Sequence, residues 1–134
     1  GPTLTVVVDA SVVVSALVDS GTTGSWAEQQ LRERPLSSPH LMPCEVANVL
    51  RRAQIAGQIT PDVAELAHAD LLDLDVLLYP YEPLAERAWS LRETVSTYDA
   101  WYVALAETLN SDMVTLDGRL AGAPGPMCTF ITPY

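Results

Sequence analysis

The chain has 134 residues, with 17 acidic and 7 basic side chains and a formal net charge of −10. All of the bases are arginines. Such an acidic chain argues against a non-specific nucleic-acid binder, which would normally carry a basic face. No apolar stretch approaches the length needed to cross a membrane, and the chain is long enough to bury a core without metal or disulfide support.

The expected domain covers residues 3–134, because Gly1-Pro2 looks like a scar left by removal of an expression tag. No signal-peptide pattern follows it. The two cysteines, Cys44 and Cys128, lack metal-ligand spacing and do not form a disulfide framework. We therefore expect a reduced, cytoplasmic setting and a buried Cys44 thiol.

Short apolar runs alternate with helical segments along the chain. In chain order we expect a strand at 4–8, a helix at 11–18 capped by Ser11, a helix at 25–34, a strand within 35–42, helices at 44–56 and 61–73, a strand at 76–79, helices at 84–94 and 98–109, a strand at 113–116, a short helix at 118–121 and a strand at 128–131. This alternation predicts an α/β fold, a parallel sheet with helices on both faces.

Several helix starts carry clear local signals. Thr60, Pro61 and Asp62 supply a hydroxyl cap, a proline in the first turn and an acid near the positive end of the helix dipole. Ser96 or Thr97 is expected to cap the helix at 98–109. The tryptophans lie within helices and are expected in the core.

Four acids lie at comparable places in these units. Asp9 and Asp117 follow apolar strands, whereas Glu45 and Asp99 lie in the first turns of helices. The carboxyl ends of parallel strands share one edge of a sheet, so we expect the four side chains to line one crevice. Each acid also has a purely structural alternative, as a helix cap, a complement to a helix dipole or the start of a turn.

Clustered carboxylates repel one another unless a cation neutralises them. An all-oxygen site suits Mg²⁺ or Mn²⁺, and one or two such ions can activate water and stabilise the leaving oxygen in phosphodiester cleavage. Ser11, Asn48 and Thr115 are candidate supporting residues because each lies near one of the acids in sequence. Asn48 shares a helix face with Glu45, although an exposed asparagine is an equally good interpretation.

The chain resembles the PIN-domain nucleases, most closely the VapC-type toxins of bacterial toxin–antitoxin pairs. The resemblance lies in four segments in the family's order: Val7-Val8-Asp9-Ala10-Ser11, Glu45-Val46-Ala47-Asn48-Val49-Leu50-Arg51-Arg52, Tyr98-Asp99-Ala100-Trp101-Tyr102-Val103-Ala104-Leu105-Ala106, and Val114-Thr115-Leu116-Asp117-Gly118-Arg119-Leu120. It implies a three-layer α/β/α sandwich with a twisted parallel sheet and a Mg²⁺- or Mn²⁺-dependent endoribonuclease. By resemblance, the catalytic, metal-binding acids are Asp9, Glu45, Asp99 and Asp117. Some family members have a further acid where this chain has Gly118 and Arg119, so the number of metal ions stays open.

The resemblance also implies an RNA substrate, a small antitoxin whose tail lies in a groove beside the crevice, and a homodimer. Arg119, two residues beyond Asp117, is the first candidate for an RNA contact, with the more distant Arg51, Arg52, Arg87 and Arg92 as further candidates or as solvated helix residues. The candidates for the partner surfaces, with burial in the helix core as the alternative, are Leu17, Val18, Trp26, Leu66, Leu71 and Leu72.

Other families with aspartates at strand ends fit less well. Receiver domains and haloacid-dehalogenase-type phosphatases use a lysine in the site, and this chain has none. A dinucleotide-binding domain would need a glycine-rich first turn, which Asp9-Ala10-Ser11 does not supply. A catalytically inactive PIN-like interaction module remains the alternative of another class, although the four intact acids weigh against it.

Overall fold

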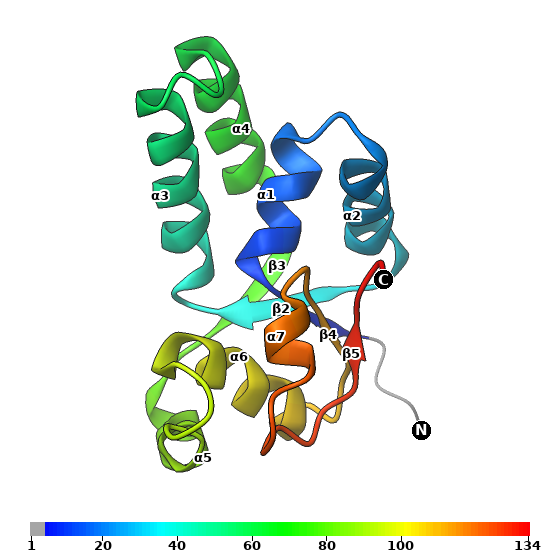
Figure 1. Ribbon diagram of the computed structural model, residues 1–134, viewed down its shortest axis with the longest axis vertical. Coiled ribbons are helices and arrows are strands. Elements are labelled where there is room, and N and C mark those ends of the chain that lie inside the picture. The colour runs from blue at the N-terminus through cyan, green and yellow to red at the C-terminus, as the bar shows by residue number, and fades with distance from the viewer. Residues whose placement is uncertain (1–4) are drawn as a thin grey trace.

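The computed structural model describes residues 5–134, and Leu4 and the preceding residues, including the expected scar, lie outside them. Within this range a five-stranded, all-parallel sheet has the order β3-β2-β1-β4-β5 (Figure 1). The strands are β1 (Val6–Val8), β2 (Leu36–Pro39), β3 (Val76–Tyr79), β4 (Met113–Val114) and β5 (Phe130–Ile131).

Helices cover both faces of the sheet: α1 to α4 lie on one side, and α5 and α6 on the other (Figure 1). In chain order they are α1 (Ala10–Val18), α2 (Thr22–Glu33), α3 (Met42–Ile55), α4 (Pro61–Asp73), the single 3₁₀ turn η1 (Glu82–Leu84), α5 (Ala85–Ser90), α6 (Thr97–Thr108) and α7 (Gly118–Ala121). The three-layer α/β/α sandwich predicted from the sequence is confirmed. None of the helices described is long and apolar enough to cross a membrane.

β1 is the central strand, paired with β2 on one side and with β4 on the other. Val6, Val7 and Val8 are at most 1% exposed, because helices cover the sheet on both faces. The ladder extends one residue past the strand, where the Asp9 amide donates to the carbonyl of Val114 at 3.0 Å. Asp9 is thereby fixed at the carboxyl edge of the sheet.

The predicted Ser11 cap of α1 is wrong, because the helix begins at Ala10 with Asp9 in the N-cap position. The Asp9 side chain makes no capping hydrogen bond to the helix. Its Oδ2 instead accepts from the hydroxyls of Ser11 and Thr115. The Asp9 and Ser11 side chains, which are typical helix caps, therefore form hydrogen bonds of a polar site and do not cap α1.

α2 begins at Thr22, three residues before the predicted start. The sequence Thr-Thr-Gly is typical of a loop, but Gly24 lies within the helix and is buried. A Cβ at Gly24 would lie 1.8 Å from the carbonyl oxygen of Asp19, so only glycine permits this close approach. The glycine is therefore a packing residue.

The remaining helix ends follow local signals in most cases. The Thr60 hydroxyl accepts from the Val63 amide at 3.2 Å, the Ser96 hydroxyl accepts from the Asp99 amide at 3.1 Å, and α7 has the predicted bounds. α5 is shorter than the predicted helix at 84–94 because it ends at Ser90. Two side chains expected in the core, Cys44 and Trp89, are exposed.

Candidate active site

Asp9 is the most buried of the four candidate acids, with 9% of its surface exposed. Its Oδ2 accepts hydrogen bonds from Thr115 Oγ1 at 2.7 Å and from Ser11 Oγ at 3.1 Å. The same two hydroxyls bind the β4–α7 connection, because Ser11 Oγ accepts from the Leu116 amide and Thr115 Oγ1 from the Asp117 amide. Asp9 and the segment leading to Asp117 thus form one hydrogen-bonded unit.

Glu45 lies in the first turn of α3, opposite α6. Its Oε1 accepts a 2.6 Å hydrogen bond from the hydroxyl of Tyr102, a buried residue of α6. The sequence alone gives no signal for this bond, because the two residues are 57 positions apart. Tyr102 fixes the direction of a carboxylate that would otherwise be free to rotate.

Asp99 and Asp117 both lie at helix starts. Asp99 lies in the first turn of α6, and Asp117 is the N-cap of α7, where its Oδ1 accepts from the amides of Arg119 and Leu120. Asp117 therefore caps a helix and does not start the turn with Gly118 that was its structural alternative, and its capping bonds engage only Oδ1. The other oxygen accepts no hydrogen bond from the part of the chain that the structure describes.

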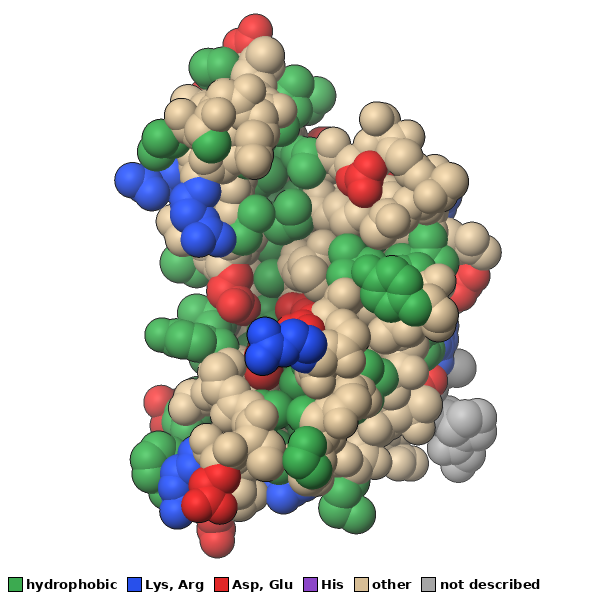
Figure 2. All heavy atoms as spheres, in the orientation of Figure 1, with side chains coloured by type: hydrophobic (Ala, Val, Ile, Leu, Met, Phe, Trp, Pro, Cys, Tyr) green, Lys and Arg blue, Asp and Glu red, His purple; other side chains and the backbone are tan. Residues whose placement is uncertain are grey.

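All four acids line one cleft of about 600 Å³ at the carboxyl edge of the sheet. Figure 2 shows this region as a hollow with acidic side chains gathered near the centre of the face. An apolar wall continues the cleft through Val14, Val18, Val49 and Leu116. Asp19, which follows α1, is a fifth acid in the lining. It was not among the residues expected at the site, and only its position just after α1, the helix that follows Asp9, could have suggested it.

Burial raises the pKa values of three of these carboxyls, and repulsion between the acids adds to the rise for Glu45 and Asp99. Desolvation raises the pKa of Asp9, although its hydrogen bonds from Thr115 and Ser11 oppose the rise. Desolvation also raises the pKa of Glu45, with further contributions from the charges of Asp9 and Asp99. The pKa of Asp99 is raised by desolvation and then by the charges of Asp9 and Asp117. A bound cation would relieve this repulsion.

The donor chemistry of the cleft fits a hard divalent ion. Its lining supplies carboxylate and hydroxyl oxygens and no histidine or cysteine. Across residues 5–134, however, no three His, Cys, Asp or Glu side chains are gathered closely enough to hold an ion. The arrangement therefore fits a hydrated ion bound through one or two carboxylates, as Mg²⁺ prefers, and not a closed cage of protein ligands.

The other candidate residues differ in where they lie. Asn48 is exposed and outside the lining of the cleft, and within the described chain no hydrogen bond joins it to Glu45. Arg119 is exposed and lines a neighbouring cleft together with Asp99 and Asp117. Arg87 is bound to Glu107 through two hydrogen bonds, and Arg92 stacks over the ring of Trp89, so neither guanidinium is a free surface cation.

The sequence pattern of the PIN domain matches residues 6–125 of this chain. Two relatives from Mycobacterium tuberculosis are similar over most of their length. Ribonuclease VapC1 is 42% identical over 123 residues, which cover 91% of this chain and 92% of the relative. Ribonuclease VapC12 is 32% identical over 120 residues, which cover 90% of this chain and 92% of the relative.

Solved structures have the same fold at lower identity. The M. tuberculosis toxin VapC20, described as cleaving the sarcin–ricin loop, has a TM-score of 0.66 at 18% identity and covers 86% of this chain and 92% of its own. VapBC2 from Rickettsia felis, solved with a DNA fragment from its promoter, has a TM-score of 0.64 at 9% identity and covers 96% of this chain and 98% of its own. At these identities the solved structures support the fold alone. The two sequence relatives, at 42% and 32% identity, are both named ribonucleases.

Proposed function

The chain belongs to the PIN-domain family, among its VapC ribonucleases, and from this premise we propose that it is a metal-dependent endoribonuclease and the toxin of a VapBC-type pair. The single observation that carries the proposal is the convergence of Asp9, Glu45, Asp99 and Asp117 on one cleft. These acids come from four segments spread over the whole chain, and three of them have raised pKa values. A helix cap or a complement to a helix dipole would not require that convergence.

In this proposal one or two of the four acids bind the ion directly and the others act through its bound water, with Mg²⁺ as the physiological metal and Mn²⁺ as a substitute. The ion supplies Lewis-acid stabilisation of phosphate charge and lowers the pKa of water for attack on the phosphodiester. Thr115 and Ser11 keep Asp9 in one orientation, and Tyr102 does the same for Glu45. Such supporting hydrogen bonds set the direction and basicity of metal-binding side chains.

The RNA backbone needs positive charge, because the cleft itself is lined by acids. Arg119 is our candidate for this contact, since it is exposed beside Asp117 and takes part in neither of the two ion pairs found among the described residues. Arginine suits phosphate because its planar guanidinium can donate two parallel hydrogen bonds. Asn48 is retained as a residue that could contact substrate, without support from a protein contact.

A VapB-type antitoxin is the proposed partner, and a homodimer is the proposed form of the toxin. The apolar wall of the cleft offers anchor points for an antitoxin tail. Among the residues suggested for partner surfaces, Leu66 and Leu72 on α4 are more than 60% exposed, whereas Leu71 is buried in the core. We further propose one PIN-like domain over residues 3–134, acting in the cytoplasm.

The test uses purified protein and a set of RNAs, with and without Mn²⁺ or Mg²⁺. Metal-dependent cleavage by the parent and its loss in Asp99→Asn would support the proposal. A protein that binds a partner but cleaves no RNA under any metal condition would instead be the inactive interaction module. The Asp99→Asn control separates cleavage by this site from a contaminating ribonuclease.

A further inference from the structure

A second cleft, of about 540 Å³, adjoins the carboxylate cleft and shares Asp99 and Asp117 with it. One of its walls is the connection between α5 and α6, residues 94–96. The opposite wall is α7 with the loop that follows it, through Pro124. The volume lies within the range of about 300–1,000 Å³ that is typical of ligand-binding sites.

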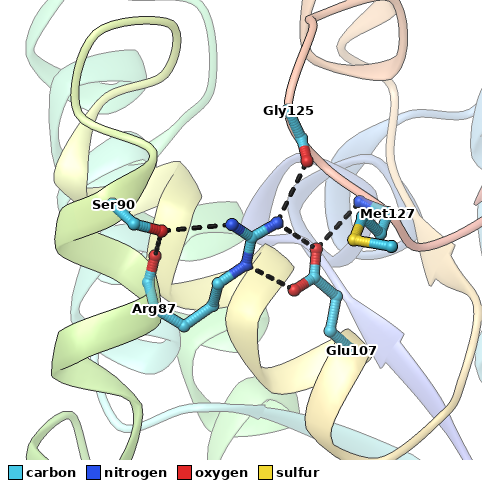
Figure 3. Close-up of polar contacts among 5 residues, drawn as sticks. All are labelled: Arg87, Ser90, Glu107, Gly125 and Met127. Atoms are coloured by element: carbon cyan, nitrogen blue, oxygen red, sulfur yellow. Dashed lines mark hydrogen bonds and ion pairs between the residues drawn. The ribbon is translucent and has the colours of Figure 1, made fainter.

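The two walls are tied together by a network centred on Arg87 of α5 (Figure 3). Arg87 donates from Nε and Nη2 to the two carboxylate oxygens of Glu107 on α6, at 2.7 and 3.0 Å. Arg87 Nη2 also donates to the carbonyl of Gly125, and Glu107 Oε2 accepts from the Met127 amide, at 3.0 and 2.8 Å. We call these four residues, Arg87, Glu107, Gly125 and Met127, the clamp.

Gly125 brings the loop into direct contact with the opposite wall. Its φ is +107°, and a Cβ at this position would lie 3.0 Å from Leu91 Cδ2 and 3.5 Å from Thr94 Oγ1. Pro124, the preceding residue, lines the cleft, as does Thr94. The clamp therefore acts one residue away from the surface that a ligand in this cleft would touch.

The charges of the two clefts differ. The carboxylate cleft continues along an apolar wall towards Asp19, whereas the second cleft carries Arg119 in its lining. Arg119 offsets part of the charge of Asp99 and Asp117 in the second cleft, whereas the first cleft adds further acids and no base, so a polyanion is repelled less along the second cleft than along the first. The N-terminus of α6, at Ser96 and Asp99, adds the positive end of a helix dipole there.

We propose that the second cleft binds the RNA nucleotides that flank the scissile phosphate, and that the clamp sets the separation of its walls. This inference rests on the proposed ribonuclease function. Arg87 and Glu107 are positioning residues, because neither belongs to the lining of either cleft. They act by holding the α7 loop, and with it Arg119, opposite the α5–α6 connection.

The test is Arg87→Gln, assayed for cleavage on an RNA that the parent cleaves and for binding on a fluorescent form of the same RNA in EDTA, where the metal-dependent reaction cannot proceed. We expect KM, and Kd for the RNA in EDTA, to rise about fivefold or more while kcat changes by less than about twofold, because the lost interaction positions substrate and leaves the reacting groups intact. Unchanged KM and Kd, or a loss confined to kcat, would overturn the inference.

Three further variants separate positioning from stability. Arg34→Gln removes the ion pair to Asp112, at the other end of the sheet, and should leave KM and Kd unchanged. Gly125→Ala keeps the ion pair but pushes the loop away from Leu91, so it should raise KM as Arg87→Gln does. The exchange Arg87→Glu with Glu107→Arg restores opposite charges but cannot donate to the Gly125 carbonyl or accept from the Met127 amide, so KM should stay high.

The outcomes also separate this inference from the function on which it rests. If the parent cleaves no RNA, the proposed function fails, whatever the variants do. If the parent cleaves and Gly125→Ala and Arg87→Gln leave KM and Kd at the parental value in folded protein, as judged by circular dichroism, only the clamp is wrong. A KM increase in Arg34→Gln equal to that in Arg87→Gln would likewise contradict it.

Discussion

The hydroxyl of Tyr102 donates a 2.6 Å hydrogen bond to Oε1 of Glu45, which joins α6 to α3 at the carboxylate cleft. Tyr102 is 1% exposed, so its hydroxyl has little access to water. Burial and the neighbouring carboxylate raise its pKa well above the usual value, so it stays a hydrogen-bond donor at every physiological pH. Glu45 is consequently held in one orientation by a group that cannot lose its proton.

Tyr102→Phe should weaken metal-dependent cleavage more than it weakens the fold. The variant loses a bond to the charged form of Glu45, so the pKa of Glu45 should rise further and the acidic limb of the pH–activity profile should move to higher pH. Loss of a bond that orients a metal ligand typically costs about tenfold or more in metal affinity or activity, whereas the stability cost should be about 1 kcal/mol.

The measurement is a Mn²⁺ titration of activity at several pH values, with a thermal melt of each variant. Tyr81→Phe is the matched control. Tyr81 packs edge-on against Trp101, a neighbour of Tyr102 on α6, but lies outside the lining of the carboxylate cleft. A Tyr102→Phe variant with parental metal dependence would show that the hydrogen bond only supports packing.

Millimolar Mn²⁺ or Mg²⁺ should raise the melting temperature of the parent. A ligand that binds only the native state stabilises it, by about 2.7 kcal/mol at a hundred times its Kd. Asp99→Asn should be at least as stable as the parent without metal, because one repelling charge is gone, and should respond less to metal. Glu28→Gln, an exposed change on α2, should respond as the parent does. A parent indifferent to both ions would count against the metal site.

The metal-free protein should become more stable as the pH falls from 7 towards the usual range of carboxyl pKa values. Asp9, Glu45 and Asp99 have raised pKa values when folded, so the folded state binds protons more tightly than the unfolded state. Their contribution to stability is full below the unfolded pKa values and is lost as the pH rises through the folded ones. The melting temperature of the metal-free protein should therefore rise as the pH is lowered.

Glu107 has the opposite effect on the pH dependence of stability, but in a lower pH range. Its pKa is lowered by the hydrogen bonds and charge of Arg87 and by the Met127 amide, against the effect of its own burial. Its stabilisation is present above the unfolded pKa and is lost only as the pH falls through the lower folded value. Melts between pH 7 and 5 therefore report the cleft acids. The slope should shrink in Asp99→Asn and persist in Glu28→Gln, and equal slopes in both variants would refute the assignment.

The sequence predicted the convergence of the four acids because their placement follows from topology. In a parallel sheet all carboxyl ends lie at the same edge, so an acid that follows any of the strands emerges at that edge. Asp9 and Asp117 follow neighbouring strands, β1 and β4, and Glu45 and Asp99 lie at the helix starts of the same edge. Capping by Thr60 and Ser96 was predictable for a similar reason, since a cap involves only the next three residues.

Contacts between distant residues were not predictable in this way. Thr115 was chosen for its nearness to Asp117, but its hydroxyl donates to Asp9, 106 positions away. Nothing in the sequence indicated that Arg87 pairs with Glu107. The two residues lie on different helices, and they meet only because α5 packs on α6. Gly24 looked like a loop residue, because the backbone of Asp19 against which it packs is visible only in the fold.

The proposed antitoxin should inhibit cleavage by placing a cation among the carboxylates of the cleft. A cleft lined by carboxylates with raised pKa values attracts a cation when it holds neither metal nor RNA. We expect an arginine or lysine of the antitoxin to enter it and to form charge-assisted hydrogen bonds with the acids. Most of the binding energy should come from apolar anchors against Val14, Val18 and Val49, because interface energy is concentrated in a few well-packed contacts.

Removing the inserted cation should therefore restore RNA cleavage in the complex while the two chains stay bound, as measured by activity and by size-exclusion chromatography of the same sample. If that complex remains fully inhibited, the antitoxin acts by covering the RNA path instead.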